Sequence, residues 1–191
     1  MNKERYLVWK DYEVLSATPA TLTDIVDSGA KNVLNYTEIG TNSDHGTTYT
    51  NNGVTFTLNS DGSITASRTA SAAVDASCNL RVASGSLYID DYCNGDYILS
   101  GCPDGGGDTT YSLRAIRDTY RPTDTGDGVE LPDKGTNVNI YLNILVMSTF
   151  KGTATFRPMI CSKAFYQISK TYQPYRPSYA ELVSRVEALE S

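Results

Sequence analysis

In residues 138–146, VNIYLNILV, every second side chain is aliphatic, and the side chains between them carry a polar group up to Asn143. Successive side chains of a β-strand point to opposite faces, so this pattern predicts a strand with one face in a core and the other toward water. The residues expected on the buried face are Val138, Ile140, Leu142, Ile144 and Val146, and those expected opposite are Asn139, Tyr141 and Asn143. One-sided burial of this kind is typical of antiparallel sheets.

Shorter stretches of the same alternation recur along the chain. They lie at 54–58, 64–66, 78–82, 87–89, 97–99, 111–115 and 153–160. Asp61-Gly62 predicts a hairpin turn between the first two stretches, and Pro158 restricts the last to an edge or a strand end. Seven or more short strands separated by turns predict one all-β domain, an antiparallel β-sandwich over residues 31–170.

Two segments flank the predicted sandwich. Residues 1–30 form an N-terminal segment in which Thr18-Pro19 predicts the start of a short helix. Residues 171–191 form a C-terminal segment that begins with TYQPYRP, whose prolines predict an extended, semi-rigid connector. A short helix is expected after it, because Ser178 and Glu181 have the spacing of a capping box.

The predicted C-terminal helix has heptad spacing. Tyr179 and Val186 take positions a, Leu182 and Leu189 take positions d, Arg185 falls at g and Glu190 at the following e. This arrangement predicts a parallel coiled coil between copies of the chain, and our hypothesis is a homotrimer. A dimer stays open because Val at a with Leu at d also suits two strands, and the stripe could instead dock on the chain's own sandwich.

Composition excludes several classes of function. The net charge of −6 and the pI of about 4.7 argue against a nucleic-acid partner, because no basic stripe is available to track phosphates. No apolar run is long enough for membrane insertion or a signal peptide, so we expect synthesis in the cytoplasm without general secretion. The cysteines, which contain no C-x-x-C pair, are expected to be free and mostly buried: Cys78, Cys93, Cys102 and Cys161.

The sequence offers little for catalysis or metal binding. Its one histidine, His45, lies in a polar loop, and no G-x-S-x-G motif is present, so no catalytic residue is predicted. No cofactor is predicted either, although calcium could bind Asp104 with Asp108, or Asp90 and Asp91 with Asp96. Neither group has EF-hand spacing, and aspartates are common in turns.

A glycan site is the remaining candidate. A sugar packs its apolar face on aromatic rings while polar side chains bind its hydroxyls, and both residue types gather between positions 88 and 114. The candidate residues are Tyr88, Asp91, Tyr92, Tyr111 and Arg114. The alternative for each tyrosine is a packing role in the sheet.

Four segments together resemble a domain found in virion proteins of tailed phages and prophages of Gram-positive bacteria. They are GVTFTLNSDGSITA (53–66), GDYILSGCPDGG (95–106), TFRPMICSKA (155–164) and YQPYRPSYAEL (172–182). The resemblance covers roughly residues 29–182. It implies a jelly-roll sandwich similar to carbohydrate-binding modules, carried on tail fibres, baseplates or head fibres, and it supplies no catalytic residues.

These observations predict a non-enzymatic virion structural protein, a fibre or decoration component of the head, neck or tail. Its expected partners are other copies of itself, other virion proteins and a host-surface glycan. The N-terminal segment around Tyr6, Val8 and Trp9 is expected to attach it to the particle. A virion protein assembles in the host cytoplasm and is released by lysis, so it needs no signal peptide. The alternatives are a free carbohydrate-binding module or lectin and, with less support, a depolymerase.

Overall fold

The computed structural model describes residues 32–41 and 43–175, and every strand pairing within this part of the chain is antiparallel. The large sheet has the order β10 (Thr123–Asp124), β9 (Tyr111–Ile116), β12 (Tyr141–Val146), β6 (Ala76–Val82), β1 (Glu38–Gly40) and β2 (His45–Gly46), with β7 (Gly85–Ser86) beside β6. A second sheet has the order β13 (Gly152–Phe156), β5 (Ile64–Arg68), β4 (Val54–Leu58) and β3 (Thr48–Asn51). A third has the order β11 (Val129–Leu131), β8 (Tyr97–Ser100) and β14 (Met159–Ser162).

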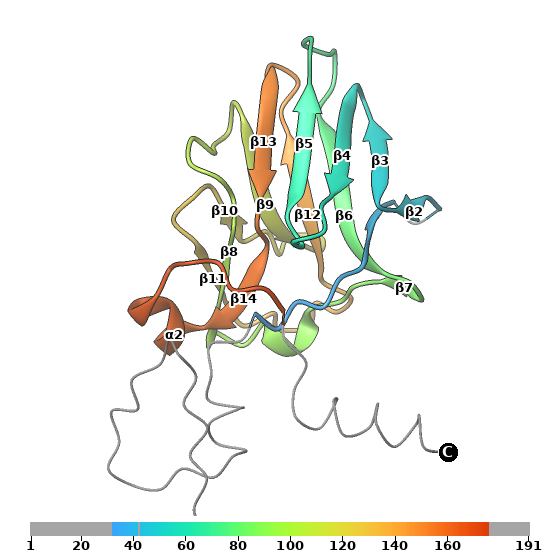
Figure 1. Cartoon of the computed structure of the whole chain (residues 1–191). Helices are drawn as coiled ribbons and strands as arrows, with labels where there is room; N and C mark the ends of the chain where they lie inside the picture. The colour runs from blue at the N-terminus through green and yellow to red at the C-terminus, as the bar shows by residue number, and fades with distance from the viewer. Residues whose placement is uncertain (1–31, 42, 176–191) are drawn as a thin grey trace, which may run out of the picture. The chain divides into compact units, whose positions relative to one another are not determined.

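The two smaller sheets join through one interrupted strand. β13 pairs with β5, and after Arg157-Pro158 the chain continues as β14, which pairs with β8. Pro158 cannot donate a ladder hydrogen bond, so it separates the two pairings. The prediction that this proline marks a strand end is therefore confirmed, and the predicted strand 153–160 is two strands. Figure 1 shows β13, β5, β4 and β3 as a layer in front of β9, β12 and β6.

The core lies between these two layers. Leu142, Ile144 and Val146 of β12 are fully buried, and they join a single cluster with buried residues of both layers, among them Phe56 and Phe156. Side chains thus alternate between core and solvent along the strands, as expected for a sandwich. The all-β, antiparallel sandwich predicted from alternation is confirmed at this level.

The start of the strand predicted over 138–146 is wrong. Val138 is 53% exposed, and β12 begins only at Tyr141. The backbone of Asn139 is left-handed, with φ at 60°, so the alternation breaks there and Val138 leaves the buried face. Ile140, on the core side of the break, remains fully buried.

Two short helices were not anticipated from the alternation pattern. η1 (Asp90–Tyr92) is a single 3₁₀ turn that follows the buried Ile89. α2 (Lys163–Ile168) begins directly after β14, where the Ser162 hydroxyl accepts a hydrogen bond from the amide of Phe165. The amide of Lys163, the first residue of α2, donates a hydrogen bond to the carbonyl of Asp96. This bond keeps α2 beside β8.

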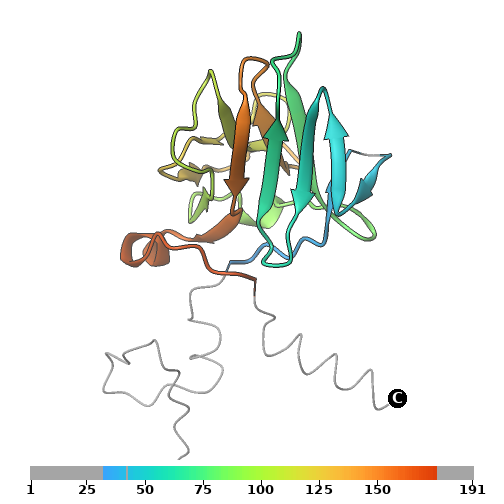
Figure 2. The ribbon, with the colours of Figure 1, turned by 45° about the horizontal axis from the view of Figure 1, so that its top comes forward.

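Hydrogen bonds hold both ends of the described chain against the two smaller sheets. Asn32 bonds the carbonyl of Pro158 and the amide of Ile160, so the incoming segment lies along β14. The hydroxyls of Tyr36 and Tyr172 donate to the carbonyls of Gly62 and Asp61, the turn between β4 and β5. Figures 1 and 2 show the first and last described residues at the end of the sandwich where α2 lies.

The remaining flanking predictions fall outside the described residues. These are the short helix after Thr18, the attachment residues Tyr6, Val8 and Trp9, and the coiled-coil residues Tyr179, Leu182, Arg185, Val186, Leu189 and Glu190.

Candidate functional site

The face of the large sheet that points away from the core, called here the outer face, carries a group of polar side chains from three neighbouring strands. Because β6, β12 and β9 alternate, the neighbours of their buried residues point outward together. The outward side chains are Ser77, Asn79 and Arg81 of β6, Tyr141, Asn143 and Leu145 of β12, and Ser112, Arg114 and Ile116 of β9.

Three of these side chains form a hydrogen-bonded row across the sheet. Asn143 lies opposite both Asn79 and Arg114 in the strand register. Its amide nitrogen donates to the side-chain oxygen of Asn79 at 2.9 Å, and its oxygen accepts from Nη2 of Arg114 at 2.7 Å. Asn143 is only 2% exposed, so these bonds fix its orientation and hold the guanidinium of Arg114 in place.

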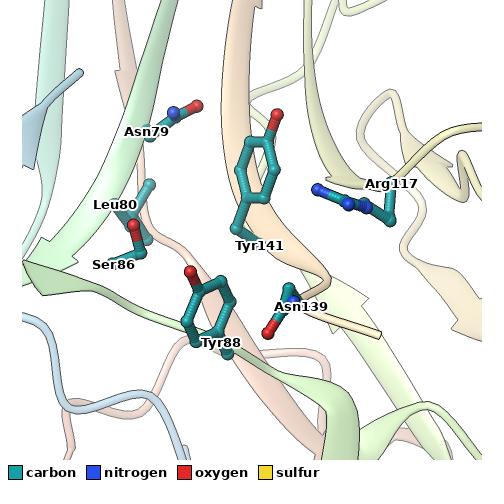
Figure 3. A pocket seen from close by; sticks show the side chains of 7 residues that line it. All are labelled: Asn79, Leu80, Ser86, Tyr88, Arg117, Asn139 and Tyr141. Carbon is teal, nitrogen blue, oxygen red and sulfur yellow. The ribbon is translucent and has the colours of Figure 1, made fainter. Parts of the chain in front are cut away.

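A small pocket adjoins one end of this row. It is lined by Asn79, Leu80, Ser86, Tyr88, Arg117, Asn139 and Tyr141, and its volume is about 140 Å³. Sites that enclose drug-sized ligands measure roughly 300–1,000 Å³, so this pocket can enclose only a part of such a ligand about the size of one ring. Figure 3 shows the rings of Tyr88 and Tyr141 in its centre, with Asn139 beside Tyr88 and the guanidinium of Arg117 directed toward Tyr141.

Local backbone geometry brings these residues together. Tyr88 follows the short strand β7 and forms a single bridge with Tyr141, which aligns the two aromatic residues on adjacent strands. Asn139 enters the pocket wall through the left-handed turn that precedes β12. Arg117 is held by a tight turn at the end of β9, where its amide and carbonyl both bond the backbone of Tyr120.

The two aromatic residues of the pocket, Tyr88 and Tyr141, differ in how much of their side chains is exposed to solvent. Tyr88 is 51% exposed, which is unusual for a large side chain on a sheet, whereas Tyr141 is half-buried. A half-exposed ring beside a half-buried one forms a small apolar platform that a ligand could cover. The polar groups of Asn79, Ser86, Asn139 and Arg117 surround this platform, as convergent polar groups do in binding sites.

The residues predicted for glycan binding are only partly brought together. Tyr88 lines the pocket, and Arg114 lies in the row next to it. Asp91 is exposed on η1 and does not line the pocket. The other two tyrosines take the packing role that was the alternative.

Tyr111 and Tyr92 are corrections to the predicted site. Tyr111 faces the core at 8% exposure, with its ring edge-on to Phe150 and Phe156 and its hydroxyl on the carbonyl of Asp104. Tyr92 is half-buried and stacks edge-on with Tyr97, at 5.2 Å between ring centroids. Tyr111, on β9, and Tyr92, on η1, thus make packing contacts and lie outside the pocket lining.

Sequence reasoning missed several residues of the pocket. Tyr141 was assigned to the outward face of its strand, but nothing in the sequence indicated which other strands would flank it. Asn79 lies on β6, and Arg117 lies in the turn after β9. Both are distant from Tyr141 in the sequence, and the strand order β9-β12-β6 makes them its neighbours. Tyr141 could have been identified from its place in the alternation, which puts its side chain on the outward face of a strand in the middle of the sheet.

The aspartates considered as calcium ligands do not form a metal site within the described residues. Within residues 32–41 and 43–175, no group of three or more His, Cys, Asp or Glu side chains is placed to hold a metal ion. Asp90 is otherwise engaged, since it lies 3.4 Å from Nζ of Lys134 and accepts a hydrogen bond from the amide of Ile140. His45 is half-exposed and lies 3.0 Å from Glu38, in line with the expected surface role.

None of the helices in the described part of the chain is long and apolar enough to cross a membrane. Comparisons of the chain with models of protein families, with curated proteins and with solved structures found no match.

Proposed function

We propose that this chain is a non-enzymatic structural component of a phage particle, of the fibre or decoration type, whose sandwich binds host-surface glycans at the outer-face pocket. The observation that carries the glycan part is the exposed ring of Tyr88 beside Tyr141, surrounded by polar side chains. The C–H face of a sugar packs on such rings, and its hydroxyls find donors and acceptors in Asn79, Ser86 and Asn139.

The particle part of the proposal is supported by where the resembling segments lie. Segment 53–66 forms the β4–β5 hairpin, 95–106 forms β8 with the loop after it, and 155–164 forms the interrupted strand and the start of α2. All three segments thus contribute strands to the two smaller sheets. A jelly-roll-like module of this kind fits the virion proteins that the sequence resembles.

The shared exit of the chain supports an outward-facing module. Because the described chain starts and stops at the end of the sandwich where α2 lies, both flanking segments connect to that end. In the proposed arrangement, residues 1–30 provide attachment to the particle and residues 178–191 provide self-association.

A glycan array of the full-length protein tests the binding function. The unmodified protein is expected to bind a subset of bacterial surface glycans, and Tyr88→Ala is expected to lose most of that signal. Val74→Ala is the matched control because Val74 is another exposed apolar side chain, 55% exposed, and does not line the pocket. Equal binding by all three proteins would contradict the assignment of the pocket.

Mass spectrometry of purified particles tests the structural function. The chain is expected in particles, and deletion of residues 1–28 is expected to remove it while the protein remains soluble in the lysate. Normal incorporation of the deletion variant would refute attachment through the N-terminal segment.

The second candidate function is a free carbohydrate-binding module or lectin. The pocket supports it equally, because the seven described residues that line the pocket all belong to the sandwich. Selective glycan binding by a protein that is absent from purified particles would favour this alternative.

A further inference from the structure

The charge of the pocket carries information about its ligand. Among the seven residues that line it, Arg117 is the one charged side chain, and no carboxylate is present. Such a pocket is unexpected in a chain with a net charge of −6. A lining that lacks acidic groups does not repel an anion, and a guanidinium binds carboxylates and phosphates with paired hydrogen bonds.

Two further arginines on the outer face have hydrogen-bonding capacity to spare. Arg81 lies opposite Ser86 in the strand register, beside the pocket wall, and is 5% exposed. Its Nε and Nη1 have no hydrogen-bond partner within the described residues, and neither does Nε of Arg114. These nitrogens are buried and lie outside the described pocket lining, so the two arginines add positive charge beside the pocket without lining it.

Acidic residues lie near the arginines of this face but are not among the described residues that line the pocket. Asp118 lies 3.5 Å from Nε of Arg117, but both side chains are exposed, and such surface pairs contribute little. Glu38 lies 3.0 Å from His45 and opposite Arg81 in the strand register. Burial lowers the pKa of Arg114, the charge of Arg121 lowers it further, and the charge of Asp75 raises it.

We propose that the outer-face pocket binds a glycan that carries a carboxylate or phosphate group, with the sugar ring against Tyr88 and the anionic group on Arg117. The proposal rests on the glycan-binding function above and specifies its ligand class. The aromatic pair supplies the apolar contact, which is common to all sugars, and the arginines supply discrimination between charged and neutral ones.

Isothermal titration calorimetry of the full-length protein tests this with matched pairs of ligands. Trigalacturonic acid is compared with neutral galactotriose, and glucose 6-phosphate with glucose, so that the carboxylate and phosphate sources are separated. In at least one pair, we expect the charged sugar to bind roughly tenfold or more tightly than the neutral one, with the difference shrinking as salt rises from about 0.02 to 0.3 M.

Two charge-removing variants assign the effect to the pocket. Arg117→Gln is expected to abolish the preference for the charged sugar, because it removes the positive charge from the pocket lining. Lys151→Gln removes the same charge from an exposed residue in the turn after β12, at the far end of that strand from the pocket, and is expected to keep the preference. Thermal unfolding of both variants checks that the exposed substitutions leave the fold intact.

The outcomes separate this proposal from the function on which it rests. Equal or tighter binding of the neutral sugars would overturn the charge preference and leave glycan binding standing. A preference that survives in Arg117→Gln would overturn the assignment to this pocket. Failure to bind every sugar in the two pairs and on the array would overturn the glycan-binding function and this inference together.

Discussion

Asp124 shows how a single side chain can hold two loops beside the core. It is 1% exposed, and its Oδ2 accepts a hydrogen bond from the amide of Cys102 at 2.8 Å. Its Oδ1 accepts from the amides of Gly126 and Gly128, at 2.9 and 2.8 Å. A carboxylate that accepts several backbone hydrogen bonds takes the place of water for donors that the loops could not otherwise pair.

Substitution of Asp124 by alanine is therefore expected to destabilise the fold strongly. The change leaves three amide groups without an acceptor, and we expect the free energy of unfolding to fall by roughly 3 kcal/mol. Urea unfolding measures this through the midpoint. Asp108→Ala, at an exposed aspartate of the adjacent loop, is the control and is expected to change stability little. A loss below about 1 kcal/mol in Asp124→Ala would show that water reaches these amides readily.

At the scale of the elements, the junction between β8 and the interrupted strand is a close backbone contact between the two smaller sheets. The amide of Arg157 donates to the carbonyl of Gly101 at 2.8 Å, just beyond the β8–β14 ladder. A Cβ atom at Gly101 would lie 2.0 Å from the carbonyl oxygen of Arg157, and the backbone of Gly101 has φ at 118°. Only glycine suits this position, because the clash is with backbone.

Gly101→Ala is accordingly expected to separate β8 from the β13–β14 junction and to lower the thermal midpoint of the protein by several degrees. Gly107→Ala is the matched control, since a Cβ atom there would meet nothing within 4 Å. Its φ of 158° is also closer to extended backbone. Equal thermal midpoints for the two variants would mean that the junction relaxes without cost.

The strands were more predictable than the site that they build. Alternation identified β4, β5, β6, β8, β9 and β12, because one-sided burial leaves a period of two in the sequence. It failed at Val138, where the left-handed backbone of Asn139 ends the strand early. It could not anticipate that Tyr88 and Arg117 would meet, since this depends on strand order and on a bridge between residues 53 positions apart, 88 and 141. Tyr111 was misassigned because inward and outward tyrosines look alike in composition.

The molecule as a whole buries four free thiols, and this predicts a dependence of stability on pH. Burial raises the pKa of Cys78 to about 12 and that of Cys161 to about 11. Burial, with a smaller contribution from the charge of Asp124, raises the pKa of Cys102 to about 12. Thiols exposed on unfolding ionise near pH 8.5, so above that pH the unfolded state releases protons that the folded state retains. Stability from this source is fully present below about pH 8.5 and is lost as pH rises toward 11–12.

The free energy of unfolding is expected to fall above pH 8.5 by up to about 1.4 kcal/mol per pH unit for each of these thiols. Urea midpoints measured from pH 7 to 10.5 check this. The Cys78→Ala variant separates the effect of thiol ionisation from general charge repulsion. Its free energy of unfolding is expected to fall less steeply with pH than that of the unmodified protein. Parallel curves for the two proteins would contradict the assignment of the effect to buried cysteine.

Assembly is the last property that belongs to the whole molecule, and it depends on residues 178–191. Their apolar stripe spans fewer than two heptads, and helices that short are marginal in water. A coiled coil of this length can fix the axis and register of an assembly only if other surfaces add to the association. Self-association is therefore expected to need both the helix and the rest of the chain.

Light scattering of the full-length protein at micromolar concentration is expected to give three times the chain mass of 20.8 kDa. The double variant Leu182→Ala with Leu189→Ala removes both d positions and is expected to lower the mass toward one chain. Ser184→Ala, at the outward f position of the same heptad, is the matched control and is expected to leave the mass unchanged. Twice the chain mass would replace the trimer by a dimer with the same seam. A single chain mass for the unmodified protein would instead place Leu182 and Leu189 outside any interface between copies, and the displayed module would then be a monomer.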